Sequence, residues 1–490
     1  MSIRVALLAA LIAWPGTALA EEDGWGDDGD DIGFAETADI KVKAPARPYS
    51  LTGFLRSREG IWLERLSDDP LSTARQSLDL KFKYKADRWR LVADVHGEYD
   101  LAYTLAEDDY DVATLDAYQW RLIQGEQYLA FSLGDLEFVL GRQAIAWGEG
   151  DVFSPLDVIS PRDEREPGLA DLDDLRLATL ATRISYFSPV GRFELVATHE
   201  GYFGERASAL GEFSPFGSVF ASDPLIATLL SSRDVRFADA QDRYDPESGS
   251  VFLRWLWNGE GLDLGLYGAW LRDRQGTVAP PEGFEMLASV LGAGLTAEQL
   301  DPLVPKALDI ELDHRRYWLV GHSGSAPMGD WLIKWELAAE INKPVNTGDL
   351  SGAVPVIGVD ETTVFTGLIG LTYSGISETT LAVEMTKGLL LDEPQDLFFP
   401  LGAPAAALRI SRTFLRETLR VDAAATALGW TAQYGWLARV ETQYAVMDGL
   451  KLGAALVHYG AGDDDEFGPF TGLDSHDQLL AKLRWDFTIF

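Results

Sequence analysis

Hydrophobic and polar residues alternate with a period of two in many separate stretches of this chain. Between Leu78 and Tyr84 the apolar residues alternate with Asp79, Lys81 and Lys83. The same alternation recurs near residues 89–99, 331–340, 419–425, 436–444 and 482–489. Successive side chains of a β-strand point to opposite faces, so this period predicts strands with two different environments.

The polar face of these stretches carries charges of both signs, and each stretch has about ten residues, the length of a membrane-spanning strand. A soluble sandwich also alternates, but its strands are usually shorter and evenly spaced. In a membrane barrel the polar face lines the interior. The residues that we expect to face the lumen are Arg90, Asp94, His96, Glu98, Lys334, Glu336, Arg439 and Glu441.

The connections between the stretches are of two kinds. Short turns, such as Ala86-Asp87 and Asp448-Gly449, alternate with much longer segments. Outer-membrane barrels have short periplasmic turns and long extracellular loops, with aromatic girdles at both membrane interfaces. Aromatic residues near the ends of the apolar faces are Trp89, Tyr99, Trp257, Trp270, Trp331, Trp436 and Tyr444.

The predicted strands lie near residues 49–65, 74–85, 89–106, 113–132, 136–147, 176–188, 192–204, 249–258, 262–272, 314–323, 331–344, 359–374, 378–388, 417–427, 434–447, 450–460 and 478–490. This set is odd, whereas single-chain bacterial barrels have an even number of strands. A hairpin across Ala407–Arg416 would give roughly 18 strands, and merging two segments would give roughly 16. The predicted fold class is therefore all-β: a transmembrane antiparallel β-barrel of roughly 16–18 strands, with long, partly helical extracellular loops and a lumen.

Three of the long connections are unexpectedly apolar. They lie within residues 205–249, 273–313 and 389–406, and in the second of these Thr296 with Gln299 resembles a capping box that opens a short helix. Apolar loops in such number do not all stay exposed to water. Either they pack on one another as a lid, or they line an entry site for an apolar solute or fold into the lumen as a constriction.

The first 48 residues are predicted to lie outside the barrel. Residues 1–20 have the features of an export signal: Arg4, an apolar run and the small-residue cleavage site Ala18-Leu19-Ala20. Residues 21–48 form an acidic, disordered tail and linker, because a stretch so rich in Asp, Glu and Gly cannot bury a core. Residues 49–490 are the barrel, and the mature protein is expected in the cell outer membrane. The chain has no Cys and therefore no disulfide.

Composition narrows the classes of function. The net charge of -36 argues against binding nucleic acid, whose phosphates would be repelled. The chain has no metal-ligand spacing, phosphate loop or cofactor motif, so we expect neither cofactor nor metal. Its six His residues suggest no catalytic triad, and we do not expect an enzyme.

One segment, from Gly141 to Asp163, is chemically denser than the rest. The residues that we single out in it are Arg142, Trp147, Glu149, Asp151, Asp157, Arg162 and Asp163. An Arg in a medium of low dielectric constant needs carboxylate partners, so Arg142 is expected to pair with an acid of its own loop and pin that loop to the wall. Trp147 is expected to cap the strand at the membrane interface, and Gly148 to permit a turn. We interpret the segment as a staple that holds a constriction, with direct solute contact as the alternative.

The side of the wall on which Arg142 lies is left open by the pattern. Phe138 and Leu140 have the same parity as Arg142. Either the strand leaves the hydrocarbon at this point, or a bulge changes the face.

The arrangement Arg142-Gln143-x-x-x-Trp147-Gly148-x-x-Asp151, followed by Pro155-x-Asp157 and Pro161-x-Asp163, resembles a family of large Gram-negative outer-membrane proteins. This family is defined only as a domain of unknown function and is similar in style to the alginate-export porins. The resemblance extends over residues 49–490. It implies an outer-membrane β-barrel that acts beside exporters of hydrophobic or lipid-like molecules, and it brings no catalytic residues with it.

The pattern and the resemblance together favour a passive outer-membrane channel for a small hydrophobic or amphipathic solute, selective through charged rings and loop closure. The alternative is a non-conducting structural or docking barrel that serves a periplasmic or inner-membrane export or lipid-transport complex. In either case the partners expected are outer-membrane lipid and the outer-membrane assembly machinery.

Overall fold

The structure is a computed structural model that describes residues 48–67, 69–170, 175–214, 228, 230, 232–278, 296–302, 304–349, 356–392, 394, 397, 400–463 and 468–490. The predicted export signal and acidic tail lie outside the described residues, apart from Pro48. Most of the apolar residues within 213–230 and 284–304, which were expected to form a lid, an entry site or a constriction, also lie outside them.

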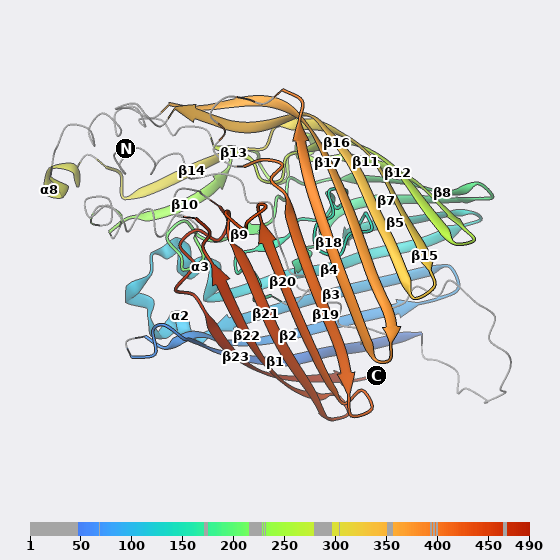
Figure 1. The fold of residues 1–490 in the computed structure, drawn as a ribbon, viewed down its shortest axis with the longest axis horizontal. Coiled ribbons are helices and arrows are strands. Elements are labelled where there is room, and N and C mark those ends of the chain that lie inside the picture. Colours follow the sequence, from blue (N-terminus) through green and yellow to red (C-terminus); the bar gives the residue numbers. More distant parts are fainter. Residues whose placement is uncertain are drawn as a thin grey trace.

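Eighteen strands form one closed antiparallel β-barrel (Figure 1), which confirms the predicted fold class. The strands are β1 (Tyr49–Trp62), β2 (Leu71–Lys85), β3 (Trp89–Asp100), β4 (Trp120–Leu133), β5 (Leu136–Gln143), β7 (Thr179–Ser188), β8 (Gly191–Thr198), β11 (Val251–Gly259), β12 (Leu262–Arg272), β15 (Arg316–Met328), β16 (Trp331–Asp349), β17 (Val356–Ile376), β18 (Thr379–Leu390), β19 (Ala405–Phe414), β20 (Leu419–Leu428), β21 (Trp436–Met447), β22 (Leu450–Gly460) and β23 (Gln478–Thr488). The last strand, β23, pairs with β1 from Thr52↔Thr488 to Trp62↔Gln478, so every strand has two partners. The strand that makes the number even is β19, which was absent from the predicted set and overlaps the segment 407–416, where one of the two alternatives placed a hairpin.

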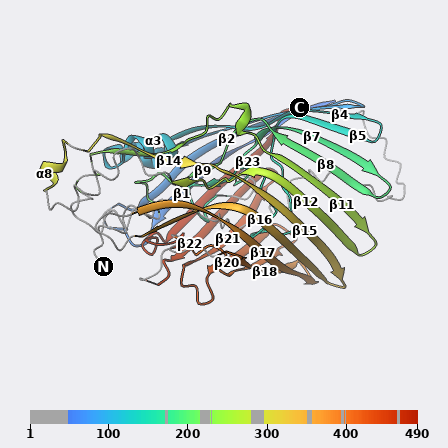
Figure 2. The same cartoon turned by 90° about the horizontal axis from the view of Figure 1, so that it is seen from above.

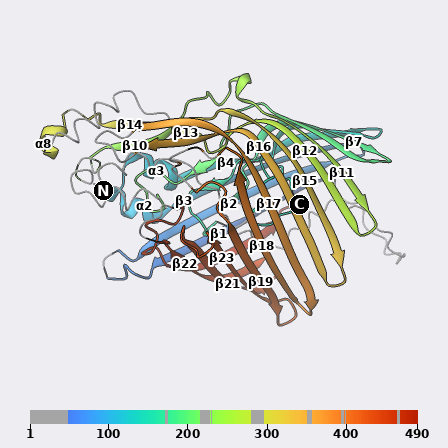
Figure 3. The same cartoon turned by 45° about the horizontal axis from the view of Figure 1, so that its top comes forward.

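Short turns join the strands at one end of the barrel, and the long connections gather at the other end (Figures 1 and 3). The turn at Asp448-Gly449 has Gly449 at φ 76°, a left-handed conformation that suits glycine. The opposite end carries the helices α2 (Leu101–Leu105), α3 (Val112–Tyr118) and α8 (Ala297–Leu300), and a small sheet of β10 (Asp234–Asp239), β14 (Ala307–Asp313) and β13 (Thr277–Val278) (Figure 3). Figure 2 shows α3, α8 and β14 at this end from above.

The two faces of the barrel wall differ as the alternation predicts. In β16, Leu337 is 59% exposed on the outside, whereas its neighbour Glu336 is fully buried inside. Of the predicted girdle residues, Trp89, Trp257, Trp270, Trp331 and Tyr444 are exposed, and Tyr99 and Trp436 are partly buried. This outer face is that of a membrane-spanning barrel.

None of the helices among the described residues is long and apolar enough to cross a membrane.

The predicted boundaries were wrong where a strand was extended into a loop. Residues 101–106 and 113–118 were assigned to strands, but most of them lie in α2 and α3. Each helix begins after an Asp whose carboxylate accepts a hydrogen bond from the helix: Asp100 from the N–H of Ala102 and Asp111 from the N–H of Thr114, both at 3.1 Å. The predicted capping box in the second apolar connection is confirmed, since the N–H of Thr296 donates to the side chain of Gln299 at the start of α8.

Candidate constriction and solute chamber

The connection between β5 and β7, residues 144–178, folds back into the barrel, and we call it the constriction loop. Its described residues contact strands far apart around the wall. Arg58 of β1 donates to the carbonyl of Leu169 at 2.6 Å, and Arg439 of β21 donates to the carbonyl of Gly168 at 3.2 Å. The start of the loop contacts β16 through Glu336, which accepts backbone N–H groups of the loop. Because these strands lie in different parts of the barrel, the loop crosses the lumen.

Two carboxylates of the wall hold the first half of the constriction loop. Glu336 of β16 accepts the N–H of Glu149 at 2.5 Å, that of Gly150 at 2.6 Å and that of Leu156 at 3.3 Å. The hydroxyl of Ser154 also donates to Glu336, at 2.9 Å. These peptide groups have no partner in a sheet, so the carboxylate satisfies donors that would otherwise be buried without a bond.

Glu384 of β18 acts in the same way on the next residues. It accepts the N–H groups of Asp151, Val152 and Phe153 at 2.5, 2.9 and 3.1 Å. Glu336 was predicted to face the lumen, but Glu384 was not singled out. The signal that could have identified it is its position between outward-facing Val383 and Met385 in an alternating strand.

Gly148 provides the turn that brings these donors to the wall. Its φ is 91°, and a Cβ at this position would lie 2.1 Å from the hydroxyl of Ser154 and 2.6 Å from a carboxylate oxygen of Glu336. The predicted turn at Gly148 is confirmed. Both the backbone conformation and the close approach of Glu336 exclude a larger residue.

Trp147 does not lie at the membrane interface, and that prediction was wrong. Its side chain is 2% exposed and packs inside the barrel with Leu156, Phe252 and other residues of one core cluster. The indole N–H donates to Glu194 of β8 at 3.0 Å, and Arg254 lies over the ring at 5.0 Å. Burial is possible because this partner satisfies the indole nitrogen.

Arg142 has a carboxylate partner, but not on its own loop as predicted. Its guanidinium pairs with Glu200, which follows β8, at 2.7 Å and donates to the carbonyl of Ala178 at 3.1 Å. The pairing of β5 with β4 and with β7 continues through Arg142 without a register shift. The strand ends at Gln143, so Arg142 lies at the mouth of the barrel, where it ties together the two segments that flank β7 and β8.

The acids predicted to surround Arg142 have other partners. Asp157 pairs with Arg162 at 2.8 Å and with Arg176 at 3.0 Å. Burial by itself raises the pKa of the Asp157 carboxyl, but the charges of Arg162, Arg176 and Arg274 outweigh it, so the pKa lies below its ordinary value.

Asp163 anchors the middle of the constriction loop. It pairs with Arg165 at 2.8 Å and with Arg121 of β4 at 2.9 Å. Burial alone raises the pKa of Asp163, but the two guanidinium groups outweigh it and lower the pKa to about 2. Three residues further on, Glu166 makes a bidentate pair with Arg75 of β2 at 2.6 and 2.7 Å. Arg165 and Glu166 were not singled out from the sequence.

The remaining acids of the dense segment face the wall on which Glu336 lies. Asp151 pairs with Lys334 at 2.7 Å, and Glu149 accepts the hydroxyl of Ser323 at 3.3 Å. Burial raises the pKa of Glu149 above its ordinary value.

The other residues predicted to line the lumen form ion pairs along the wall. Glu98 lies 3.1 Å from His96, 3.5 Å from Arg56 and 3.6 Å from Arg121. The further pairs are Arg90 with Glu137 (3.8 Å), Arg439 with Glu441, and Glu441 with Lys482 (3.0 Å). Asp94 lies against Gly125 of β4, where a Cβ would be 2.7 Å from its carboxylate.

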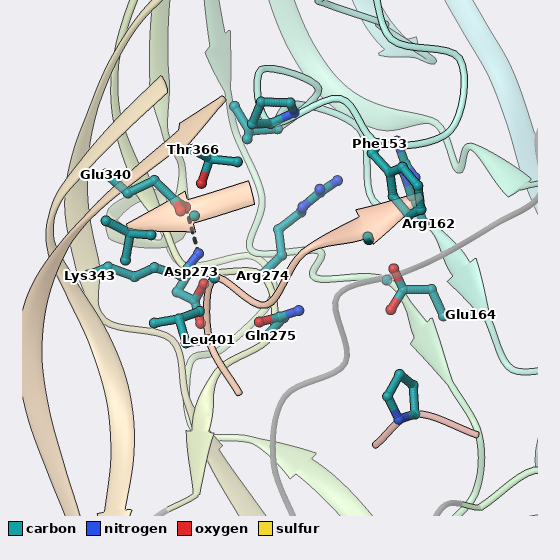
Figure 4. A pocket seen from close by; sticks show the side chains of 18 of the residues that line it. Phe153, Arg162, Glu164, Asp273, Arg274, Gln275, Glu340, Lys343, Thr366 and Leu401 are labelled. Atoms are coloured by element: carbon teal, nitrogen blue, oxygen red, sulfur yellow. Dashed lines mark hydrogen bonds and ion pairs between the residues drawn. The ribbon is translucent and has the colours of Figure 1, made fainter. Parts of the chain in front are cut away.

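A chamber of about 380 Å³ lies between the constriction loop and the wall of β16, β17 and β18 (Figure 4). Its charged lining residues are Arg162, Glu164, Glu205, Arg206, Asp273, Arg274, Glu340 and Lys343. Phe153 and Leu401 also line it, and Leu401 belongs to the connection 389–406, which was predicted to be apolar. Of the constriction and lumen residues singled out from the sequence, only Arg162 lines this chamber.

The closed barrel, with an apolar outer face and a loop folded inside it, defines a β-barrel of the outer-membrane type. The chain belongs to the family described as "Protein of unknown function (DUF1302)", whose model matches residues 69–458. No curated protein matches the sequence.

The chain is similar to solved structures of proteins from two organisms. OccAB3 of Acinetobacter baumannii has 11% identity and a TM-score of 0.49, covering 90% of this chain and 99% of that chain. OccK8 (OprE) of Pseudomonas aeruginosa has 10% identity and a TM-score of 0.47, covering 90% and 98%. OccK2 (OpdF) of the same organism, in complex with glucuronate, has 12% identity and a TM-score of 0.46, covering 90% and 98%.

Proposed function

We propose that the protein is a porin-like outer-membrane channel for the passive passage of a small amphipathic solute, and not an enzyme. The observation that carries this proposal is the constriction loop, which crosses a closed barrel with a charged inner wall and leaves a chamber beside it. A loop that narrows a lumen without filling it sets the size and chemistry of what can pass. The mixture of charged and aromatic residues around the chamber supports an amphipathic solute.

The proposal includes the route to the membrane and the roles of the predicted residues. Residues 1–20 would direct export, and the assembly machinery would insert the barrel with its short turns in the periplasm. Arg142, Trp147, Asp151, Asp157 and Asp163 would hold the constriction, and Arg162 would contact the solute.

The test is conductance of the purified protein in planar bilayers. We expect discrete channels in the wild type and a larger conductance when residues 149–170 are replaced by a short Gly-Ser linker. Heat-dependent migration on gels would show that the wild type and the loop-replacement variant are both folded barrels. A folded wild-type barrel without conductance would overturn the channel and favour the non-conducting docking barrel.

A further inference from the structure

Two arginines lie on the outside of the barrel wall, at the end that carries the long connections. Arg272 is the last residue of β12 and Arg316 is the first residue of β15, and the two are Cα partners in the pairing of these strands. Each lies two residues from an outward tryptophan: Trp270 in β12 and Trp318 in β15, which are 41% and 54% exposed. Because side chains two residues apart on a strand share a face, both arginines lie on the outer face of the wall.

The two guanidinium groups are close enough to share one acceptor atom. Arg272 donates to the carbonyl oxygen of Glu247 through Nη2 at 3.0 Å, and Nη2 of Arg316 donates to the same oxygen. Arg272 also donates to the carbonyl of His314 at 2.9 Å. Arg316 also donates to the carbonyl of Gly249 at 2.7 Å. These carbonyl groups hold the guanidinium groups in place but carry no net charge, so two positive charges remain side by side.

No carboxylate neutralises this pair in the part of the chain that the structure describes. Neither arginine forms an ion pair within 4.0 Å there, and Nη1 of Arg316 has no hydrogen-bond partner there. The carboxylate of Glu247 acts on Arg316 from a greater distance, and its effect is weaker than that of the like charge of Arg272. Asp313 is held by Arg315 at 2.8 Å. An anion between the two guanidinium groups would reduce their repulsion and supply acceptors.

Next to the arginines, toward the short turns, the outer face is aromatic and then aliphatic. The rings of Trp270 and Trp318 have their centroids 6.2 Å apart, and the guanidinium of Arg316 lies 4.0 Å from the centre of the Trp270 ring. Further along the same strands Leu266 and Val320 are exposed. Tryptophans on the outside of a barrel mark the depth of the lipid head groups. The arginines therefore lie at head-group level, and the aliphatic residues face acyl chains.

This arrangement fits a phosphate group that is attached to a lipid. Arginine binds phosphate oxygens through its planar fork, and two guanidinium groups within reach of one oxygen suit a group with several acceptor oxygens. A free phosphate ion would gain only these hydrogen bonds. A phosphorylated lipid would gain them and also place its acyl chains on the apolar wall.

We propose that Arg272 and Arg316 bind the phosphate of a phosphorylated lipid in the outer leaflet, whose acyl chains lie on the wall beside Trp270 and Trp318. The site lies outside the lumen and goes beyond the proposed channel function. It rests only on the proposed orientation of the barrel, with the short turns in the periplasm.

The experiment is native mass spectrometry of the detergent-solubilised protein with three probes: dioleoyl phosphatidic acid, dioleoylglycerol and inorganic phosphate. We expect phosphatidic acid to bind at least about tenfold more tightly than dioleoylglycerol, the effect of charge-assisted hydrogen bonds to its phosphate. Inorganic phosphate at the same concentration should not displace it. Arg272→Gln and Arg316→Gln should each reduce the preference for phosphatidic acid, and the double variant should abolish it.

Lys387→Gln is the matched control and should keep the preference. Lys387 is an exposed basic residue near the same end of β18, and its ammonium group donates to the carbonyl of Gly402 at 2.7 Å. Heat-dependent migration on gels shows which variants are folded barrels. The single variants carry the test if the double variant does not fold.

Equal binding of the two lipids, a preference that survives the double substitution, or a preference lost in Lys387→Gln would overturn the inference. Displacement of the lipid by inorganic phosphate would assign the site to a free ion and overturn the lipid. Conductance in planar bilayers tests the channel separately, and the double variant should conduct as the wild type does. A lipid preference without channels would refute only the proposed function, and channels without the preference would refute only this inference.

Discussion

At the scale of single residues, Glu384 shows how one inward side chain organises a loop distant in sequence. Its two oxygens accept three successive peptide N–H groups of the constriction loop. Glu336 does the same for residues just before and after them. Hydrogen bonds to a charged acceptor are stronger than neutral ones, so these two carboxylates fix the position of the loop.

Replacing Glu384 by Gln should loosen the constriction loop. The three N–H groups would lose a charged acceptor, and we expect the free energy of local opening around residues 151–153 to fall by about 2 kcal/mol. Hydrogen exchange of these amides measures the change. Glu137→Gln is the matched control, because Glu137 is a wall carboxylate paired with Arg90 at 3.8 Å. Equal exchange in the two variants would contradict the role given to Glu384.

Arg142→Ala should destabilise the mouth of the barrel. Glu200, whose side chain is fully buried, would keep Arg243 at 3.0 Å but lose Arg142, and the free energy of unfolding should fall by about 2 kcal/mol. Arg142→Lys should lose part of this amount, because an ammonium group cannot reproduce the planar fork of a guanidinium. Thermal unfolding followed by gel migration measures the loss of stability in both variants. An unchanged unfolding midpoint for Arg142→Ala would contradict a stabilising role for the pair of Arg142 and Glu200.

At the scale of elements, the constriction loop is held by buried ion pairs, so its stability depends on pH. The pKa of Asp163 is lowered to about 2 by Arg165 and Arg121 despite burial. A carboxyl group with a lowered folded-state pKa stabilises the fold above its ordinary pKa, and this stabilisation is lost as the pH falls through the folded-state value.

We therefore expect the wild type to lose about 2 kcal/mol of stability between about pH 5 and pH 2 through Asp163 alone. Asp163→Asn should be less stable than the wild type at neutral pH, and the difference should shrink as the solution is acidified. Thermal unfolding across this range measures it. A difference that stays constant with pH would show that Asp163 contributes through packing and not through its charge.

The alternation of apolar and polar residues was sufficient to predict some of the strands but not their ends. The wall strands were predicted well because each must present an apolar face to lipid and a polar face to the lumen. Predicted strands 89–106 and 113–132 failed at α2 and α3, beyond the wall, where this requirement ends and where Asp100 and Asp111 cap helices. The predicted strands 331–344 and 359–374 were too short. In the structure β16 continues to Asp349 and β17 begins at Val356, and these extensions pair with each other as a hairpin.

At the scale of the whole molecule, the outer face of the closed barrel exposes many large apolar side chains, and this gives a test of how deep each position lies in the membrane. Leu337→Arg, in the middle of the wall, should cost about 2–4 kcal/mol, whereas Trp331→Arg, beside a short turn, should cost about 0–1 kcal/mol. Both side chains are exposed on the outside, at 59% and 47%. Refolding into lipid vesicles from urea measures the two costs, and equal costs would argue against the membrane orientation of the wall.

The sequence alone determined the barrel, a range of roughly 16–18 strands that includes the observed number, and the position of the segment that became the constriction loop. These follow from a local rule, because alternation and turn residues act between neighbours in the chain. Only the tertiary structure decided the partners inside. Arg142 reaches Glu200, Trp147 reaches Glu194, and the chamber arginines Arg206 and Arg274 come from separate connections. Such pairs join residues far apart in the chain, and closure of the barrel and folding of the loop into its lumen bring them together.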